Sequence, residues 1–197
     1  MQRSRAIVIF LAFIFFLFFV GWLLISSLGG HNKQPATPAA VVKSLPDYAA
    51  TTAVTSMTID GQVNGDDIHR AIRVTIGQNQ RELDIIQGYS GHVLSSQTFY
   101  NTQDAYTVFL KSINNSGFLL PLKNSNAPAD ERGQCPLGSR YIFELDQNGS
   151  ALSRLWASDC GSKIGTLGGS STLLQNLFEA QIPEYQTLTE DVSLGSE

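Results

Sequence analysis

The sequence predicts an α+β fold, in which one small domain has an antiparallel sheet of about six strands with two helices on one face, behind an N-terminal transmembrane helix. Three observations predict it. Residues 6–28 form an uncharged apolar run, evenly spaced turn signals separate short alternating segments, and two stretches with helical spacing of apolar residues flank an Asn-Gly hairpin signal.

Residues 6–28 are expected to cross a membrane. The run holds six phenylalanines and no charge, and a helix of this length covers the roughly 30 Å hydrocarbon core at about 1.5 Å per residue. A secretory signal usually has a shorter apolar region of about 7 to 15 residues. A retained anchor is therefore favoured over a signal cleaved near Gly29, and no cysteine follows the run to carry a lipoprotein anchor.

Arg3 and Arg5 precede the apolar run, and the positive-inside rule then keeps the N-terminus cytoplasmic and exports the rest. The expected location is the cell membrane, with a single pass and the lipid bilayer as one partner. The expected organisation is a cytoplasmic N-terminus (1–5), a transmembrane helix (6–28), an extracytoplasmic stalk (29–49), an exported α+β domain (50–185) and a flexible acidic tail (186–197).

The exported part is acidic. It carries 11 basic and 17 acidic residues, a net charge of −6, with no basic stripe. Nucleic-acid binding would lack its main electrostatic contribution, so it is excluded as a function.

The first half of the domain is expected to be a meander of four strands. Residues 68–76 show the clearest pattern, because Ile72, Val74 and Ile76 alternate with polar residues. Turn signals such as Asn64-Gly65 separate the runs. The four expected strands are 54–63, 68–76, 81–87 and 92–100.

Two helices are expected. In the first, Asn101 or Thr102 can cap the N-terminus and Gly117 supplies the left-handed stop. Its apolar face repeats at i, i+3, i+4 and i+7. The second begins at Ser170 or Ser171 and ends at Ile182-Pro183. The apolar positions are Tyr106, Phe109, Leu110 and Ile113 in the first helix, and Leu173, Leu174, Leu177 and Phe178 in the second.

Between these helices, Asn148-Gly149 predicts a hairpin of strands 140–145 and 151–158. A two-residue loop there places Tyr141 opposite Trp156, and Leu145 opposite Leu152.

The two cysteines, Cys135 and Cys160, lie at the open end of this hairpin. An even cysteine count outside the cytoplasm favours a disulfide over free thiols. Closing a loop of this length stabilises the fold by about 3 kcal/mol on the chain-entropy estimate. A metal site needs more ligands than two cysteines.

No cofactor, metal or catalytic residue is expected. His69 and His92 show no spacing that would bring them together with a carboxylate, and no Gly-x-Ser-x-Gly motif is present. The glycine-rich segment 165–171 precedes a helix but lacks the lysine of a P-loop. The candidate binding surface consists of three tyrosines at expected turns or ends, Tyr89, Tyr100 and Tyr185.

Five further segments of the chain are DAYTVFLKSINNSGF, RGQCPLGSRYIFEL, LWASDCG, GTLGGSS and LFEAQIPEY. Together they resemble the C-terminal half of a group of short, uncharacterised, single-pass membrane proteins of ultra-small candidate-phylum bacteria. This resemblance implies an envelope location and a similar architecture, and it implies no activity.

The function expected from these features is non-enzymatic. The exported domain would bind an unknown envelope or protein partner, or stabilise an envelope assembly. Two alternatives remain at this point: an exported hydrolase that acts on cell-envelope material, and a small-ligand binder that uses a cavity between sheet and helices. A cleft with two carboxylates would favour the hydrolase, whereas a deep apolar pocket would favour the small-ligand binder.

Overall fold

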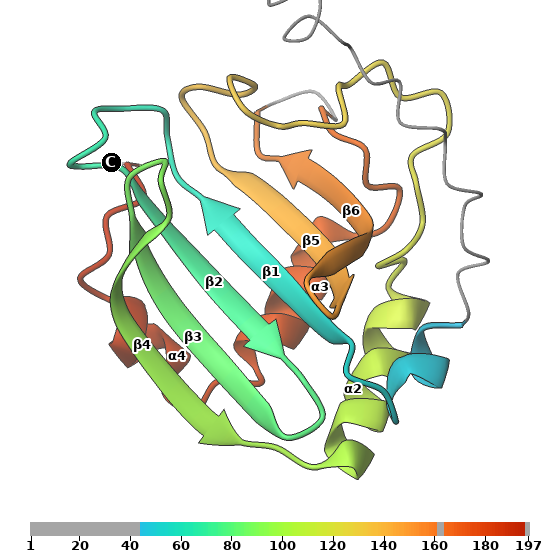
Figure 1. The fold of residues 1–197 in the computed structure, drawn as a ribbon. Helices are drawn as coiled ribbons and strands as arrows, with labels where there is room; N and C mark the ends of the chain where they lie inside the picture. The colour runs from blue at the N-terminus through green and yellow to red at the C-terminus, as the bar shows by residue number, and fades with distance from the viewer. Residues whose placement is uncertain (1–43, 161–163, 196–197) are drawn as a thin grey trace, which may run out of the picture. The chain divides into compact units, whose positions relative to one another are not determined.

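The computed structural model describes residues 44–160 and 164–195 (Figure 1). Its centre is a six-stranded sheet with the order β4-β3-β2-β1-β5-β6, in which every neighbouring pair is antiparallel. The expected α+β class and the strand order along the chain are confirmed. The strands are β1 (Val54–Asp60), β2 (Arg70–Ile76), β3 (Gln80–Gln87), β4 (His92–Tyr100), β5 (Arg140–Gln147) and β6 (Ser150–Ser158).

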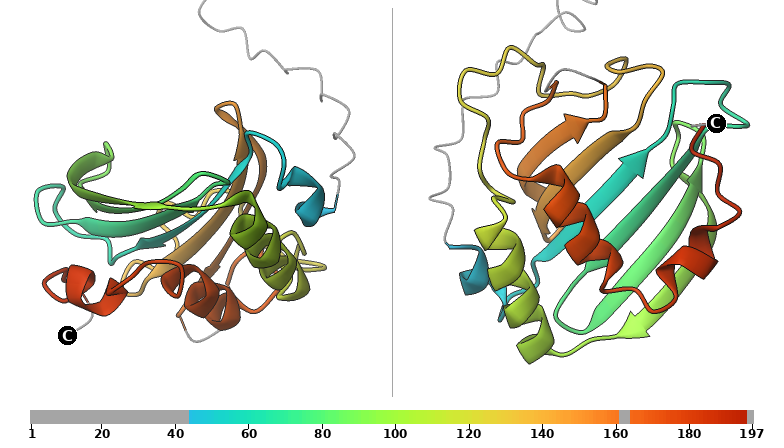
Figure 2. Two further views of the ribbon diagram at one scale, coloured as in Figure 1. Left: turned by 90° about the horizontal axis from the view of Figure 1, so that it is seen from below. Right: turned by 180° about the vertical axis from the view of Figure 1, so that it is seen from behind.

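Helices α2, α3 and α4 lie on the same face of the curved sheet, and no helix of the described part of the chain lies on the other face (Figure 2). The bounds are η1, a short 3-10 helix (Leu45–Tyr48), α2 (Gln103–Asn115), α3 (Ser171–Glu179) and α4 (Tyr185–Thr189). Two of these helices were expected from the sequence, and η1 and α4 were not.

Local sequence explains where α2 begins and ends. The Thr102 hydroxyl accepts a hydrogen bond from the Ala105 amide at 3.2 Å, which satisfies one free N–H of the first turn. Gly117 has φ of 84°, and the Phe118 amide donates to the Ile113 carbonyl at 3.1 Å. This is the left-handed stop that the sequence predicts.

The core lies between the sheet and the helices. Alternate strand residues such as Met57, Val74 and Leu145 point to this face and are fully buried. Aromatic rings from different elements meet there: Phe143 of β5 contacts Phe118 and Phe178, at centroid distances of 6.2 and 6.3 Å. The covered face is therefore held by apolar packing.

The hairpin of β5 and β6 forms at the expected turn but in a different register. Tyr141 lies opposite Ala157 and Leu145 opposite Ser153, so the expected pairs with Trp156 and Leu152 are wrong. A register shift between Leu145 and Asp146 is the cause, because an extra residue in one strand changes every pair beyond it.

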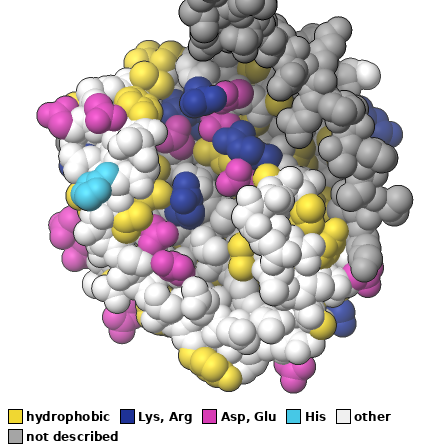
Figure 3. Space-filling model, in the orientation of Figure 1, with side chains coloured by type: hydrophobic (Ala, Val, Ile, Leu, Met, Phe, Trp, Pro, Cys, Tyr) yellow, Lys and Arg dark blue, Asp and Glu magenta, His cyan; other side chains and the backbone are white. Residues whose placement is uncertain are grey.

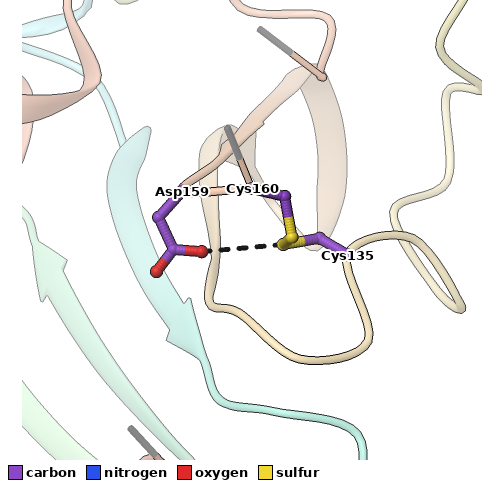
Figure 4. A group of neighbouring side chains, drawn as sticks. All are labelled: Cys135, Asp159 and Cys160. Carbon is purple, nitrogen blue, oxygen red and sulfur yellow. Dashed lines mark hydrogen bonds between the residues drawn. A yellow bond between two sulfur atoms is a disulfide. The ribbon is translucent and has the colours of Figure 1, made fainter. Parts of the chain in front are cut away.

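The disulfide between Cys135 and Cys160 is present, with Cα atoms 5.7 Å apart (Figure 4). It joins the loop before β5 to the residue that follows β6 by two positions. Asp159 Oδ1 lies 3.6 Å from Cys135 Sγ, the contact drawn in Figure 4. A disulfide sulfur carries no hydrogen, so this is a close contact, whereas the same oxygen accepts a hydrogen bond from the Ser139 amide at 2.9 Å.

The folded domain extends beyond both expected boundaries. Leu45 and Tyr48, placed in the stalk by the sequence, are buried in the core. At the other end, Leu188, Val192 and Leu194 pack against the core, and the Leu194 carbonyl accepts a hydrogen bond from the Gln62 amide at 2.9 Å. Scattered apolar residues in an acidic tail gave no periodic signal, which is why the tail was expected to be flexible.

No helix within residues 44–160 and 164–195 is long and apolar enough to cross a membrane. The apolar run 6–28 lies outside the described residues, so the transmembrane helix stays a prediction.

Candidate functional site

The face of the sheet without helices carries charged side chains of both signs over its upper middle (Figure 3). Strand alternation explains this, because the neighbours of the core residues point to the opposite face. A depression of about 240 Å³ lies on this open face. Its lining includes Asp60, His69, Arg73, Tyr89, Glu131, Glu144 and Arg154.

Asp60, at the end of β1, connects two buried side chains. Its Oδ2 accepts hydrogen bonds from Arg140 Nη2 at 2.6 Å and Nε at 2.9 Å, and its Oδ1 lies 2.8 Å from His69 Nε2. The Arg140 and His69 side chains are 1% and 2% exposed, whereas Asp60 is 20% exposed. If one member of this network were removed, the polar groups that remain would be too buried for water to replace the lost hydrogen bond.

Both ring nitrogens of His69 are occupied by protein acceptors. Nδ1 lies 3.0 Å from the Gln62 carbonyl, and Nε2 faces the Asp60 carboxylate. Because each ring nitrogen faces an oxygen of the protein, neither nitrogen is directed at the pocket, and His69 is not placed to act as a general base on a bound molecule.

Tyr89 covers His69 at the edge of the pocket. The two rings stack with centroids 4.1 Å apart, and the Tyr89 hydroxyl bonds the backbone amide and carbonyl of Asn64, both at 3.0 Å. Gly88 precedes it with φ of 69°, and an added Cβ there would lie 3.0 Å from the Asp66 carbonyl oxygen. Glycine therefore lets the β3–β4 turn pack against the β1–β2 loop.

Arg154 of β6 holds two carboxylates on the other side of the pocket. Its Nη2 donates to Glu131 Oε1 at 2.7 Å, and its Nε donates to Glu144 Oε1 at 2.9 Å. Glu131 Oε2 lies 2.6 Å from Nη1 but off the hydrogen-bonding direction. The hydrogen bond from Arg154 to Glu131 is the main cause that raises the pKa of Arg154 above its ordinary value.

Glu131 reaches this position because its loop is fastened to the sheet. The indole Nε1 of the buried Trp156 donates to the Pro128 carbonyl at 2.9 Å. Arg132, next in the chain, pairs instead with Asp130 on the exposed side of the loop. The segment 128–132 thus forms a wall of the pocket.

Arg73 differs from the other cations of the pocket. Among the residues that the structure describes, no carboxylate oxygen lies within ion-pair distance of its guanidinium. Its Nε donates to the Thr58 hydroxyl at 3.3 Å, and the residue is exposed. The guanidinium can therefore receive an acceptor from a bound molecule without breaking an internal ion pair.

Exposed apolar side chains, here called the loop rim, border the same end of the sheet. Hydrogen bonds connect the three loops that carry them: the Val63 amide donates to the Pro136 carbonyl at 2.9 Å, and the Tyr89 amide donates to Asp66 at 2.8 Å. The loop rim consists of Val63, Ile68, Tyr89 and Leu137, which are 44%, 58%, 53% and 81% exposed.

The structure separates the three tyrosines of the expected binding surface. Tyr89 lines the pocket, and Tyr100, 79% exposed, lies at the opposite end of β4. Tyr185 is buried at the start of α4, and burial raises its pKa above the ordinary value. Tyr89 is therefore the member of the set that lies at the candidate site.

The two histidines do not come together, since His69 is buried against Asp60 whereas His92 is exposed at the start of β4. Within the described residues, the one cluster with metal-ligand spacing is Cys135, Asp159 and Cys160. Its sulfurs are bonded to each other and are not thiolate ligands.

Sequence reasoning missed Asp60, Arg73, Arg140, Glu131 and Arg154. Asp60, Arg140, Glu131 and Arg154 come from strands and a loop that are distant in sequence, so no local pattern brings them together. Arg73 could have been found as the charged outward position of the clearest alternating run.

The sequence matches no protein-family model and none of the curated proteins with which it was compared.

Proposed function

We propose that this protein is a non-enzymatic binding module, anchored in a membrane through residues 6–28, whose exported domain holds a protein or envelope partner on the open face of the sheet. The observation that carries the proposal is the position of Arg73. Among the residues that the structure describes it is a cation without a carboxylate partner, in a depression bordered by the exposed Tyr89 and the rest of the loop rim.

The chemistry of the pocket supports binding over hydrolysis. Two carboxylates, Glu131 and Glu144, lie in the depression, but both are held by Arg154. Asp60 is held by Arg140 and by His69. An acid and a base for hydrolysis must exchange protons with a substrate, and carboxylates fixed in ion pairs are poorly placed to do so.

The dimensions support a macromolecular partner over a small ligand. Pockets that enclose a drug-sized molecule have volumes of about 300 to 1,000 Å³ and mostly apolar walls. The depression here is smaller, near 240 Å³, and charged groups form much of its lining. A projecting group of a larger partner fits such a surface, with a carboxylate or phosphate on Arg73 and apolar contacts on the loop rim.

Site-specific photocrosslinking in intact cells tests this proposal. A photoreactive amino acid replaces Tyr89 or Leu137 of the loop rim, and Lys111, an exposed residue of α2, serves as the matched control on the helical side. The expected result is one product of defined mass from positions 89 and 137 and none from position 111. Equal capture from all three positions, or capture from position 111 alone, would contradict it.

The proposed anchor has its own test. Protein recovered from membranes should retain Arg3 at its N-terminus, because an uncleaved helix keeps the preceding residues. A mature N-terminus near Gly29 would show a cleaved signal instead, and membrane anchoring through residues 6–28 would then be wrong.

A further inference from the structure

The two edges of the sheet are covered to different extents. On β6, the segment that follows it folds back: the Thr166 amide donates to the Trp156 carbonyl at 2.8 Å, and Ala157 forms a bridge with Gly165. On β4, no strand pairs with the outer side within the described part of the chain. Eight of the nine residues of β4 are exposed.

An open edge strand is a template for another strand, and proteins usually protect it with lysine, proline or a bulge. The sequence of β4, HVLSSQTFY, contains neither lysine nor proline. A register shift is present only at its start, where Ile85 pairs with Ser95 and Ile86 with Val93, so Leu94 is the extra residue. The stretch 95–99 is regular and open.

We propose that β4 pairs with β4 of a second copy of this chain, antiparallel and centred on Gln97. This register uses the regular stretch and places no charged residue opposite another. The opposed pairs are Ser95 with Phe99, Ser96 with Thr98, Gln97 with Gln97, and Leu94 with Tyr100.

Self-pairing suits this strand for two reasons. Leu94 and Tyr100, 48% and 79% exposed, would cover each other across the interface. Hydroxyl pairs such as Ser96 with Thr98 are also favourable across antiparallel strands. The result is a two-fold symmetric dimer with one continuous sheet. Its open faces would lie side by side, although the proposal does not rest on binding at the pocket.

Substitution at the two-fold axis tests the proposal. The full-length protein in detergent is studied by analytical ultracentrifugation over a range of concentrations. Gln97→Lys places two ammonium groups directly opposite each other, whereas Gln97→Met has a similar size and no charge. The dissociation constant of the dimer should rise at least about fivefold for Gln97→Lys and stay near the wild-type value for Gln97→Met.

Two results would overturn the proposed pairing of β4 with β4. One is a wild-type protein that stays monomeric at all concentrations. The other is a dimer that Gln97→Lys leaves unchanged, as association through residues 6–28 alone would give. Circular dichroism of both variants checks that the fold is kept.

Disulfide crosslinking gives an independent readout of the register. Cα atoms of opposed residues in antiparallel strands lie about 4.5 to 5.5 Å apart, within reach of a disulfide. Gln97→Cys should form a crosslinked dimer on mild oxidation, whereas Val108→Cys, 62% exposed on α2, should not. Equal crosslinking of the two variants would contradict pairing at β4.

Discussion

The two faces of the sheet are held by different forces. On the face under α2 and α3, rings such as Phe143 and Phe178 are buried against each other without polar partners. On the open face, Asp60, Glu131 and Glu144 are fixed by arginines. Apolar burial supplies most of the stability of a small domain, whereas ion pairs add little when exposed and mainly fix geometry. The covered face should therefore determine most of the stability, with the buried Arg140 and its partner Asp60 as the exception on the other side, and the open face should determine what the domain contacts.

The largest expected loss of stability comes from a substitution in the core of the covered face. Phe143→Ala removes a fully buried ring that contacts Phe118 and Phe178, and should lower the free energy of unfolding by about 4 kcal/mol. Arg73→Ala on the open face should change it by less than about 0.5 kcal/mol. Urea denaturation measures both, and equal losses would contradict the division between the faces.

The next prediction concerns the buried guanidinium of Arg140, which pairs with Asp60 on the open side of the sheet. Arg140→Met leaves His69 as the one remaining side-chain partner of Asp60 among the described residues. The variant should lower the free energy of unfolding by about 3 kcal/mol, because a partly buried carboxylate loses its main partner. Arg132→Met, whose side chain is 82% exposed, is the control and should shift the denaturation midpoint only slightly. A midpoint unaffected by Arg140→Met would show that the Asp60 network does not support the fold.

Loss of the disulfide should lower the free energy of unfolding by a similar or slightly smaller amount than Arg140→Met. The double variant Cys135→Ser/Cys160→Ser opens a loop with a sequence separation of 25 and should lose about 3 kcal/mol on the chain-entropy estimate. Complete reduction should lower the denaturation midpoint of the wild type to that of the double variant, and it should leave the midpoint of the double variant unchanged. A wild-type midpoint insensitive to complete reduction would refute the structural role of the bond.

The smallest expected effect lies on the exposed side of the pocket wall. Hydrogen bonds from Arg132 lower the pKa of Asp130 from 3.8 to about 2. Because the folded-state pKa is the lower one, the stabilisation is present above pH 4 and is lost as the pH falls toward 2. NMR titration of the Asp130 carboxyl should show this midpoint, and Arg132→Gln should return it toward the ordinary value.

What the sequence could predict follows the same division. The residues of the covered face recur at regular intervals in the sequence. This spacing, together with the capping residues, could predict the order of the strands, the caps of α2 and α3, and the burial of Phe109 and Phe178. The cysteine pair could be predicted from its place around an Asn-Gly turn.

The open face could not be predicted, because its contacts join distant segments. Asp60 and Arg140 are 80 residues apart, and Glu131 lies in a loop without periodicity. The hairpin register failed for a local reason, since the irregularity beside Leu145 has no reliable sequence signal. The burial of Tyr185 could not be predicted, because it begins α4, a helix of five residues that is too short to show a periodic pattern.

The most direct test of the open face is the Arg73→Gln variant, measured for stability and for partner capture in the same cells. Removing this charge without adding another should leave the urea midpoint near the wild-type value, because Arg73 forms no internal ion pair among the described residues. Photocrosslinking from position 89 should then lose its product. Undiminished capture by a stable Arg73→Gln protein would show that the open face is not the binding surface.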